Sequence, residues 1–236
     1  MIRVARPGDG LGAEALAKIA LGMNNDTLTE PGPFAAGIDE HGGLVPLPYG
    51  SGCALVACDG DDALIGLAYT CPPVLLIEAY AELGPAGQRH LTHALAELEM
   101  LAVAEHARGA GVGSALLAAT EERLRAGGAR LLFAKVARDD RKVLRWYRRR
   151  YYTLATPREP VVITIAGHEI VFDDGGDGYL LAVKALDPAE QVGRVTARTG
   201  SYLTVQPAHP PTPPRSSPSG RAPLGAARKA SLPDHG

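Results

Sequence analysis

Hydrophobic and polar positions along residues 1–186 follow two spacings, one typical of helices and one typical of strands. A short apolar run at Ile2–Ala5 predicts a strand, and Pro7-Gly8-Asp9 turns the chain into a predicted helix. The apolar residues of that helix recur three and four positions apart, which places them on one face. They are Leu16, Ile19, Ala20 and Met23.

The next part of the chain predicts a loop and then a β-hairpin. Residues 24–51 are rich in glycine and proline, so we expect mostly loop with one weak helix. The apolar runs Cys53–Cys58 and Ala63–Tyr69 are separated by Asp-Gly-Asp-Asp, a sequence typical of a hairpin turn. Residues 74–83 and 88–95 both follow a helical pattern, although the first could also extend a strand.

The second half of the chain alternates between predicted strands and helices, which indicates an α/β fold with a mixed sheet and helices on its faces. Strands are predicted near Glu97–Val103, Ala129–Val136, Val161–Phe172 and Tyr179–Ala185, and helices at Val112–Arg125 and Arg141–Tyr151. By the two-residue period of a strand, Glu97, Glu99, Leu101 and Val103 should share one face.

The composition changes near residue 187. Residues 188–236 contain nine of the chain's 19 prolines and six lysines or arginines but only two acids, and apolar periodicity is limited to Tyr202–Val205. Such a segment buries too little surface to offset its ordering entropy. We therefore expect a folded domain at residues 1–186 and a disordered, weakly basic tail at residues 187–236.

Charge and composition narrow the setting in which the chain works. The net charge of -2 favours neither nucleic acid nor an anionic membrane as a partner, and no apolar run has the length of a membrane span. The first residues lack the apolar core of a signal peptide, and three cysteines cannot all pair. No spacing of Cys or His suggests a metal site. We expect a cytoplasmic protein without a metal.

A glycine loop between the predicted strand at Glu97–Val103 and the following helix is the main candidate for chemistry. Gly109, Gly111 and Gly113 let the backbone approach a ligand closely, because glycine has no Cβ. The N–H groups of the new helix point outward at the positive end of its dipole, and Arg108 adds a cation. This arrangement favours a phosphorylated ligand.

Two common phosphate-binding patterns do not fit this loop. The P-loop requires a Gly-Lys pair at its end, and none is present here. A dinucleotide-binding fingerprint requires a third glycine where Ser114 stands, and an acid near the end of the next strand. The nearest acid there, Asp139, comes late.

The loop resembles the coenzyme-A signature [QR]-x-x-G-x-[GA] of the GNAT superfamily of N-acetyltransferases, with Arg108, Gly111 and Gly113 at the specified positions. The preceding Leu101-Ala102-Val103 resembles the family's strand end, and residues 114–117 resemble its helix entry. The resemblance covers about residues 2–186. It implies a GNAT-like fold, with a mixed, mostly antiparallel sheet flanked by helices.

A second family motif, N-x-x-[AS]-x-x-x-Y-x-x-x-G-F, has a partial counterpart after the next strand. Asp140 stands at the asparagine, Val143 at the small residue and Tyr147 at the tyrosine, while Tyr151 and Tyr152 replace Gly-Phe. Asp140 loses an amide donor, and Tyr151 lacks glycine's freedom to adopt a left-handed turn. The segment between Thr70 and Ala96 is also longer than the family's usual hairpin.

The resemblance implies an acetyl-CoA-dependent N-acetyltransferase in which an amine attacks the thioester directly. The residues that it places at acetyl-CoA are Leu101, Ala102, Val103, Arg108, Gly109, Ala110, Gly111, Val112, Gly113, Ser114, Asp140 and Tyr147. It also implies that the Val103 N–H polarises the thioester carbonyl.

Acyl transfer to an amine needs a base, because an alkylammonium with a pKa near ~10.4 holds its proton at neutral pH. Glu97 and Glu99 are the candidates. Relative to Val103, Glu97 holds the place of the catalytic glutamate of histone-type family members, and repulsion between the two carboxylates should raise one pKa. The resemblance makes Tyr147 the acid that protonates the departing thiolate.

Other interpretations remain open. The departures at Asp140 and Tyr151 allow a catalytically inactive module that senses acyl-CoA, and the basic tail allows a partner-docking protein. The acceptor, a small-molecule or peptide amine, cannot be read from the sequence, nor can the preferred acyl chain. The apolar segment Val74–Ile77 could form the interface of a homodimer.

Overall fold

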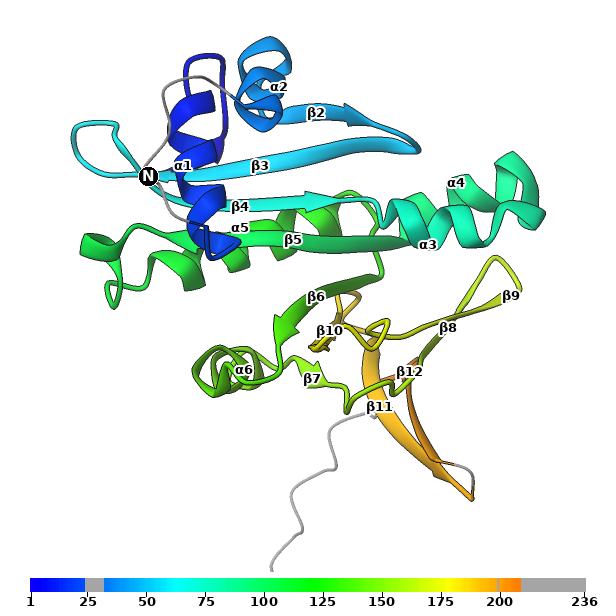
Figure 1. Ribbon diagram of the computed structural model, residues 1–236. Helices are drawn as coiled ribbons and strands as arrows, with labels where there is room; N and C mark the ends of the chain where they lie inside the picture. The colour runs from blue at the N-terminus through cyan, green and yellow to red at the C-terminus, as the bar shows by residue number, and fades with distance from the viewer. Residues whose placement is uncertain (24–31, 199, 209–236) are drawn as a thin grey trace, which may run out of the picture.

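The computed structural model describes residues 1–23, 32–198 and 200–208. Within them the chain forms two β-sheets with helices packed on their faces (Figure 1). The α/β class and the mixed, mostly antiparallel sheet are confirmed. The part of the predicted loop at residues 24–31 lies outside the described residues.

The larger sheet runs β1-β3-β4-β5-β6-β10-β7, with β2 paired to the free part of β3. Its strands are β1 Ile2–Val4, β2 Leu44–Leu47, β3 Gly50–Cys58, β4 Leu64–Cys71, β5 Leu95–Val103, β6 Leu131–Ala137, β7 Thr153–Leu154 and β10 Tyr179–Ala185. Neighbours are antiparallel except β5 and β6. The predicted hairpin corresponds to β3 and β4, where Asp59 Oδ1 accepts hydrogen bonds from the N–H groups of Asp61 and Ala63.

The parallel pair β5 and β6 separates along its length. Only residues 95–97 of β5 pair with β6, opposite Leu131–Phe133, while β5 continues to Val103 paired with β4 alone. A gap therefore opens in the middle of the sheet, between the strand that ends at the glycine loop and its neighbour. Both cavities described below border this gap.

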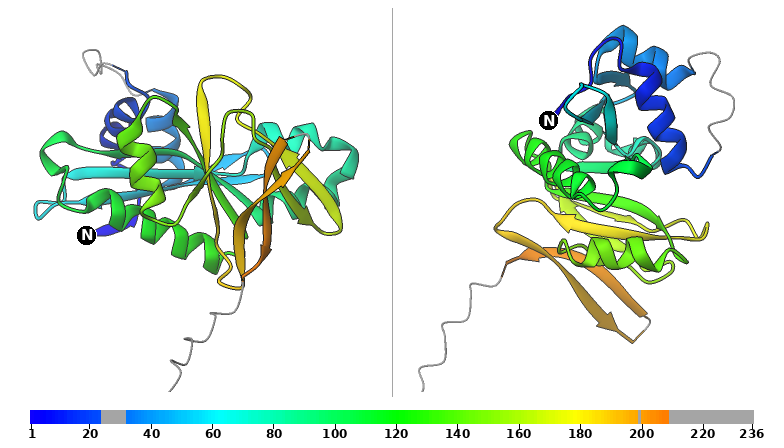
Figure 2. Two further views of the ribbon diagram at one scale, coloured as in Figure 1. Left: turned by 90° about the horizontal axis from the view of Figure 1, so that it is seen from below. Right: turned by 90° about the vertical axis from the view of Figure 1, so that its left-hand side faces the viewer.

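Helices cover the two faces of the larger sheet, as Figure 2 shows. Helices α1 Gly10–Ala20 and α2 Pro33–His41 pack on one face of β3–β5, whereas α5 Val112–Ala126 and α6 Arg141–Arg148 pack on the other. Because both faces are covered, the Cys53–Cys58 run of β3 is apolar throughout instead of alternating. Helix α1 ends before Met23, which is exposed, so the predicted fourth position of its apolar face is wrong.

The smaller sheet runs β11-β12-β8-β9 and packs with helices on the remaining part of β6 and β10. Its elements are β8 Val161–Ile165, β9 His168–Phe172, β11 Glu190–Ala197 and β12 Gly200–Pro207, together with α3 Val74–Ala79, the 3₁₀ turn Ala81–Leu83 and α4 Gly84–Ala94. Residues 74–83 and 88–95 are thus mainly helical, as the main interpretation predicted, while the predicted strand at Val161–Phe172 is a hairpin of two strands.

The expectation of a disordered tail from residue 187 is wrong for residues 190–207. β11 and β12 form a hairpin whose second strand pairs with β8, and Leu203 is fully buried. The alternation in this stretch is weak, because most of its side chains are only half-buried. The sheet edge of β8 supplies the hydrogen-bond partners that the segment lacks by itself. The remainder, residues 209–236, lies outside the described part of the chain.

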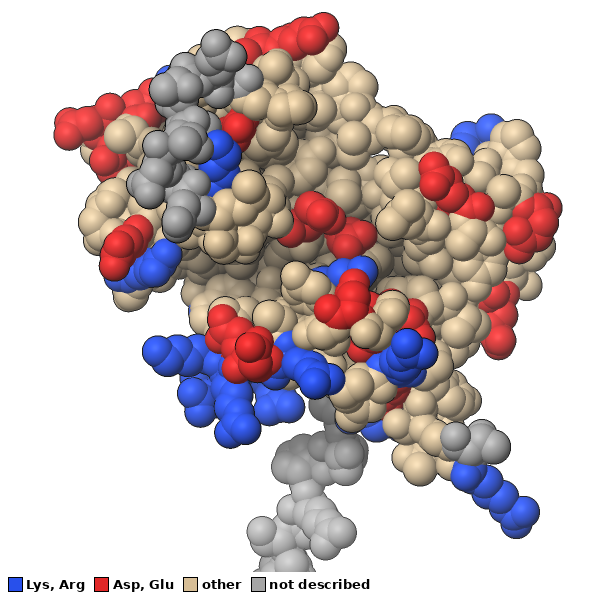
Figure 3. Space-filling view, viewed as in Figure 1, with Lys and Arg blue, Asp and Glu red and all other residues tan. Residues whose placement is uncertain are grey.

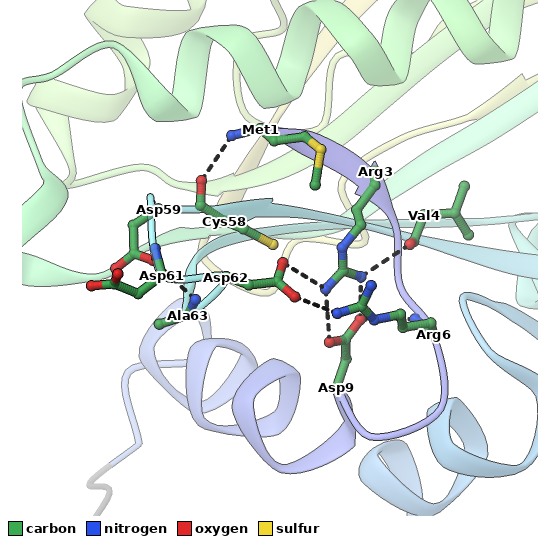
Figure 4. A network of polar contacts seen from close by, with 10 residues as sticks. All are labelled: Met1, Arg3, Val4, Arg6, Asp9, Cys58, Asp59, Asp61, Asp62 and Ala63. Atoms are coloured by element: carbon green, nitrogen blue, oxygen red, sulfur yellow. Dashed lines mark hydrogen bonds and ion pairs between the residues drawn. The ribbon is translucent and has the colours of Figure 1, made fainter.

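A network of charged side chains ties the N-terminal strand to the hairpin turn between β3 and β4 (Figure 4). Arg3 forms a bidentate ion pair with Asp9 at 2.5 and 3.0 Å and also approaches Asp62 at 3.6 Å. Arg6 pairs with the same Asp62 carboxylate, and the N-terminal ammonium donates to the Cys58 carbonyl at 2.8 Å. These contacts hold β1 and the start of α1 against the sheet.

Candidate active site

The glycine loop has the backbone that the sequence predicted. After β5 ends at Val103, a 3₁₀ turn spans Glu105–Ala107, and α5 begins at Val112. Gly109 and Gly111 have φ of 83° and 86°, values in the left-handed region that favours glycine. No atom lies within 4 Å of a Cβ built on either glycine, so the loop borders open space. Helix α5 therefore directs its first, unpaired N–H groups into that space.

A cavity of about 570 Å³ lies at this loop, between the start of α5 and one side of α6. It is lined by Leu101, Val103, Ala107, Arg108, Gly109, Gly111, Val112, Gly113, Ser114, Lys142, Val143, Trp146, Tyr147, Arg149 and Arg150. We call it the donor cavity. The charged side chains of its lining, Arg108, Lys142, Arg149 and Arg150, are all cations, which suits a ligand with several phosphate groups.

Most residues predicted to bind acetyl-CoA lie at this cavity, but three do not line it. Ala102 is buried in the core under α1, because its side chain points to the opposite face of β5. Ala110 does not line the cavity, and Asp140 lines the neighbouring one. The Asp140 carboxylate caps α6 by accepting hydrogen bonds from the N–H groups of Lys142 and Val143, at 3.1 and 3.0 Å.

Arg150 is a residue of this cavity that the sequence did not single out. Its guanidinium lies 3.8 Å from the centre of the Trp146 ring and donates to the Trp146 carbonyl at 2.9 Å. It also donates to Ser114 Oγ in the first turn of α5. Arg150 thus joins the end of α6 to the phosphate-binding loop. The basic run at residues 138–150 was the available signal, but a solvated helix face gives the same pattern.

A second cavity, also of about 570 Å³, lies beside the gap between β5 and β6. It is lined by Ala20, Leu21, Gly22, Glu97, Leu98, Glu99, Leu101, Ala134, Lys135, Val136, Ala137, Asp140, Val143, Tyr147 and Tyr179. We call it the acceptor cavity. It shares Leu101, Val143 and Tyr147 with the donor cavity, so the two meet at Tyr147.

Tyr147 is held by an aromatic cluster and a buried charged network. Its side chain is 4% exposed and packs edge-on against Trp146 and Tyr152, with ring centres 4.9 and 5.0 Å away. The Tyr152 hydroxyl donates to Glu121 at 3.0 Å, and Lys184 pairs with the same carboxylate at 2.6 Å. Burial raises the pKa of Tyr147 above its ordinary range, which Arg150 partly offsets. The phenol therefore keeps its proton at neutral pH.

Among the described residues, the Tyr147 hydroxyl has no hydrogen-bond partner, although the cluster around it is densely packed. The phenol thus lies at the junction of the two cavities without a partner in the described chain.

Glu97 and Glu99 project into the acceptor cavity from β5. A β-bulge interrupts the β4–β5 register at this point, since Tyr69 pairs with Met100 and Thr70 with Leu98. The bulge shifts the alternation by one residue, so Leu98 and Leu101 both pack under α5. The prediction that Glu97, Glu99, Leu101 and Val103 share one face is therefore wrong, because a bulge breaks the two-residue period.

The environment of Glu97 favours its protonated form. Burial first, and then the nearby Glu99 carboxylate, raise the pKa of Glu97 to about 7, while Lys135 acts in the opposite direction. Like-charge repulsion contributes as predicted, but loss of hydration is the larger cause. A carboxylate with this pKa can accept a proton from an ammonium and release it to solvent near neutral pH.

The backbone at the end of β5 leaves the Val103 N–H group directed at the gap. The Ala104 N–H donates to the Ile65 carbonyl of β4 at 2.9 Å. Because successive N–H groups of a strand point to opposite edges, the Val103 N–H points toward β6, which no longer pairs with β5 there. The side chain of Arg108 donates to the Val103 carbonyl at 3.2 Å and steadies this end.

Comparison with known proteins places this arrangement in a family. The sequence profile of the acetyltransferase (GNAT) family matches residues 32–151, more than half of the chain. The chain therefore belongs to this family, whose members transfer an acetyl group from acetyl-CoA. No curated protein matches the chain at a significant level.

Two solved structures illustrate the fold. A phosphinothricin acetyltransferase from Sinorhizobium meliloti, in complex with acetyl-CoA, has a TM-score of 0.51 at 19% identity and covers 78% of this chain and 87% of its own. The yncA protein of Salmonella typhimurium, solved with its cofactor acetyl-CoA, has a TM-score of 0.51 at 17% identity, over 80% and 94%. These similarities show a common fold.

In the part of the chain that the structure describes, no helix is long and apolar enough to cross a membrane. No group of three Cys, His, Asp or Glu side chains there could hold a metal ion.

Proposed function

We propose that this GNAT-family N-acetyltransferase uses Glu97 as the general base and Tyr147 as the general acid, with acetyl-CoA in the donor cavity and the amine in the acceptor cavity. The observation that carries the proposal is the position of Tyr147, which lines both cavities. A thioester at this junction would have the amine on one side and the phenol beside its sulfur.

On the donor side, the residues proposed to contact acetyl-CoA are Leu101, Val103, Arg108, Gly109, Gly111, Val112, Gly113, Ser114 and Tyr147. The pyrophosphate would bind the N–H groups at the start of α5, where the helix dipole favours negative charge. Lys142, Arg149 and Arg150 line the opposite wall and would face the remaining phosphate. The side chains of three other predicted residues would not contact acetyl-CoA; these residues would support its site through the backbone and the fold. They are Ala102, Ala110 and Asp140.

The reaction balances with the groups present. The acceptor ammonium gives one proton to Glu97, and the freed nitrogen lone pair attacks the thioester carbonyl carbon. The nitrogen then gives its second proton to water, the C–S bond breaks with its electron pair staying on sulfur, and the thiolate takes a proton from Tyr147. Tyr147 is reprotonated through water, and Glu97 releases its proton to solvent.

The Val103 N–H would stabilise the oxyanion that forms when nitrogen attacks. A single preorganised donor in a water-poor site contributes about 3 kcal/mol to such a transition state. Glu99, more exposed than Glu97, is the alternative base. The inactive acyl-CoA-sensing alternative finds no support here, since a base and an acid flank the junction where the thioester would lie.

Tyr147→Phe tests the proposal. We expect kcat to fall by about 100-fold, because the thiolate must then take its proton from water, while the Kd for acetyl-CoA changes less than about threefold. Stopped-assay thiol release and isothermal calorimetry measure the two quantities. Tyr202→Phe, a half-buried tyrosine on β12 away from both cavities, is the matched control. Unchanged turnover in Tyr147→Phe would remove this residue from the chemistry.

The proposed homodimer interface at Val74–Ile77 stays a prediction. Leu75 is 82% exposed, whereas Ile77 is buried in the cluster beneath α3 and α4.

A further inference from the structure

In the described chain, the acceptor cavity contains two carboxylates without partners, of which Glu97 is half-buried and Glu99 is exposed. Among the described residues, every buried carboxylate is hydrogen-bonded or ion-paired within the protein. These are Asp9, Glu14, Glu121, Glu159 and Asp174. Glu97 is half-buried, and no hydrogen bond or ion pair to it or to Glu99 is present in the described chain. Removing a carboxylate from water without a partner destabilises its charged form.

The other charged residues that line this cavity do not neutralise the two glutamates, so its net charge is negative. Lys135 is the cation of the described lining, and its ammonium lies 3.5 Å from the Asp177 carboxylate. Asp140 is engaged in capping α6. Figure 3 shows the same distribution, with acidic side chains in the central hollow of this face and basic ones gathered over α6. A ligand that fits this cavity would bring positive charge.

The cavity also contains an unpartnered polar group apart from these acids. The hydroxyl of Tyr147, whose side chain is 4% exposed, has no hydrogen-bond partner in the described chain, and the residue lines this cavity. The remaining walls are mainly apolar, including Leu98, Leu101 and Val136. The cavity therefore combines the Tyr147 hydroxyl, two anions and apolar side chains.

We infer that the acceptor is an aliphatic amine with a second positive charge, whose reacting nitrogen lies at Glu97 and whose other ammonium is held by Glu99. This inference rests on the proposed function and names the acceptor class of the same site. Glu97 and Glu99 stand on either side of Leu98 in β5, next to the bulge, and the exposed Glu99 is the outer of the two acids. A diamine with four carbons between its nitrogens is a short member of this class and serves as the probe below.

The charges that line the cavity favour a diamine over two other classes of acceptor, monoamines and amino acids. A monoamine would leave Glu99 without a partner. An amino acid would place its carboxylate beside Glu97 and Glu99, with a lysine already paired to Asp177 as the sole cation of the described lining. Both arrangements leave an unbalanced charge in a cavity that is partly shielded from water.

The test compares three acceptors of equal chain length with the full chain and acetyl-CoA: 1,4-diaminobutane, butylamine and 4-aminobutanoate. We expect kcat/KM to be about tenfold higher for the diamine than for butylamine, as for a hydrogen bond to a charged group, and lowest for 4-aminobutanoate. Thiol release measures turnover, and the thermal shift of the acetyl-CoA-bound protein measures binding of each amine.

Glu99→Gln locates the second ammonium. We expect this variant to lose about tenfold more kcat/KM with the diamine than with butylamine, and to lose it mainly through KM. Glu169→Gln, an exposed glutamate on β9, is the matched control and should behave as the unsubstituted chain does with all three acceptors.

Equal kcat/KM for diamine and butylamine would overturn the inference, and so would a preference for 4-aminobutanoate. If acetyl-CoA raises the Tm but none of the three amines reacts or adds a further shift, the inference is wrong while the donor site stands. If acetyl-CoA itself gives no shift, the proposed function fails instead.

Discussion

The surroundings of Glu97 destabilise its charged form and therefore lower the stability of the fold at high pH. Its pKa of about 7 in the folded protein lies above the ordinary value of 4.5, so the folded protein binds a proton that the unfolded chain releases. The stability that this proton contributes is present below pH 4.5 and is lost as the pH rises through 7. At higher pH the charged carboxylate destabilises the fold.

Glu97→Gln should therefore change activity and stability in opposite directions. At pH 8 we expect the free energy of unfolding to rise by about 1–3 kcal/mol, whereas at about pH 4.5 it should not change. The acid limb of kcat/KM near pH 7 should disappear as activity falls. Urea unfolding and a pH–rate profile measure these effects, with the exposed Glu82→Gln as control. A variant that keeps the acid limb would assign the base to another group.

Tyr151 carries backbone strain at a position where the family motif has glycine. Its φ is 65°, in the left-handed region, and its side chain is 88% exposed, so little packing offsets the strain. We expect Tyr151→Gly to stabilise the protein by about 1 kcal/mol, because glycine adopts this conformation without a Cβ clash. Thermal unfolding measures the gain. Tyr151→Ala retains the Cβ and should show no such gain; equal gains would exclude backbone strain as the cause.

At the scale of elements, the start of α5 depends on a left-handed turn at Gly111, the residue before the helix. We expect Gly111→Asp to abolish the increase in Tm that acetyl-CoA produces, because the substitution adds strain and a negative charge beside the pyrophosphate. Thermal shift with acetyl-CoA measures this.

Gly167→Asp is the control for backbone strain. Gly167 has φ of 84° in the open turn between β8 and β9, remote from the donor cavity. The Gly167→Asp variant should lower the Tm by an amount similar to Gly111→Asp, but acetyl-CoA should still raise its Tm. Retention of the shift in Gly111→Asp would contradict the placement of the phosphates.

Helix α6 contributes to the site through its contacts with α5 and the sheet. Arg150 bonds Ser114 at the loop, and the Tyr152–Glu121–Lys184 network connects the segment after α6 to α5 and β10. Tyr147 lies between these two attachments. The tyrosine that replaces phenylalanine at position 152 therefore adds a buried hydrogen bond beside the proposed acid.

In the whole molecule, an ion pair with a buried carboxylate helps to attach the smaller sheet, beside the apolar cluster between the two sheets. Glu159, between β7 and β8, binds Arg194 of β11 at 2.7 and 2.8 Å and accepts a hydrogen bond from Ser201 of β12 at 2.6 Å. The residues beyond 187 are thus part of the folded unit as far as β12. Burial opposes the charged form of Glu159, but its hydrogen bonds outweigh burial and lower its pKa to about 2.

Arg194→Ala should lower the free energy of unfolding by about 3 kcal/mol at pH 7, because Glu159 is left charged and buried. The stability from this pair is present above the ordinary glutamate pKa of 4.5 and is lost as the pH falls through about 2. The difference from the unsubstituted chain should therefore shrink over that window in urea titrations. Arg198→Ala, at the exposed hairpin turn, should have no effect; a constant difference across the window would contradict the assignment.

Features that depend on local spacing could be predicted from the order of the residues. The phosphate loop could be predicted because glycines at fixed intervals and a following apolar helix pattern are local signals. The positions of β3, β4, β6, α5 and α6 followed for the same reason. Tyr147 was identifiable because this stretch resembles a family motif that has a tyrosine at this position.

Features that depend on contacts between distant segments could not be predicted in this way. The bulge at Glu99 arises from pairing with β4, so the strand period alone could not place the two glutamates on the acceptor side. β11 and β12 form because β8 offers an open edge, which their weak alternation does not reveal. The acceptor cavity exists because β5 and β6 separate after three residue pairs. Strand register and strand separation are properties of paired strands. For that reason the acetyl-CoA site could be predicted from one continuous segment, whereas the acceptor cavity could not.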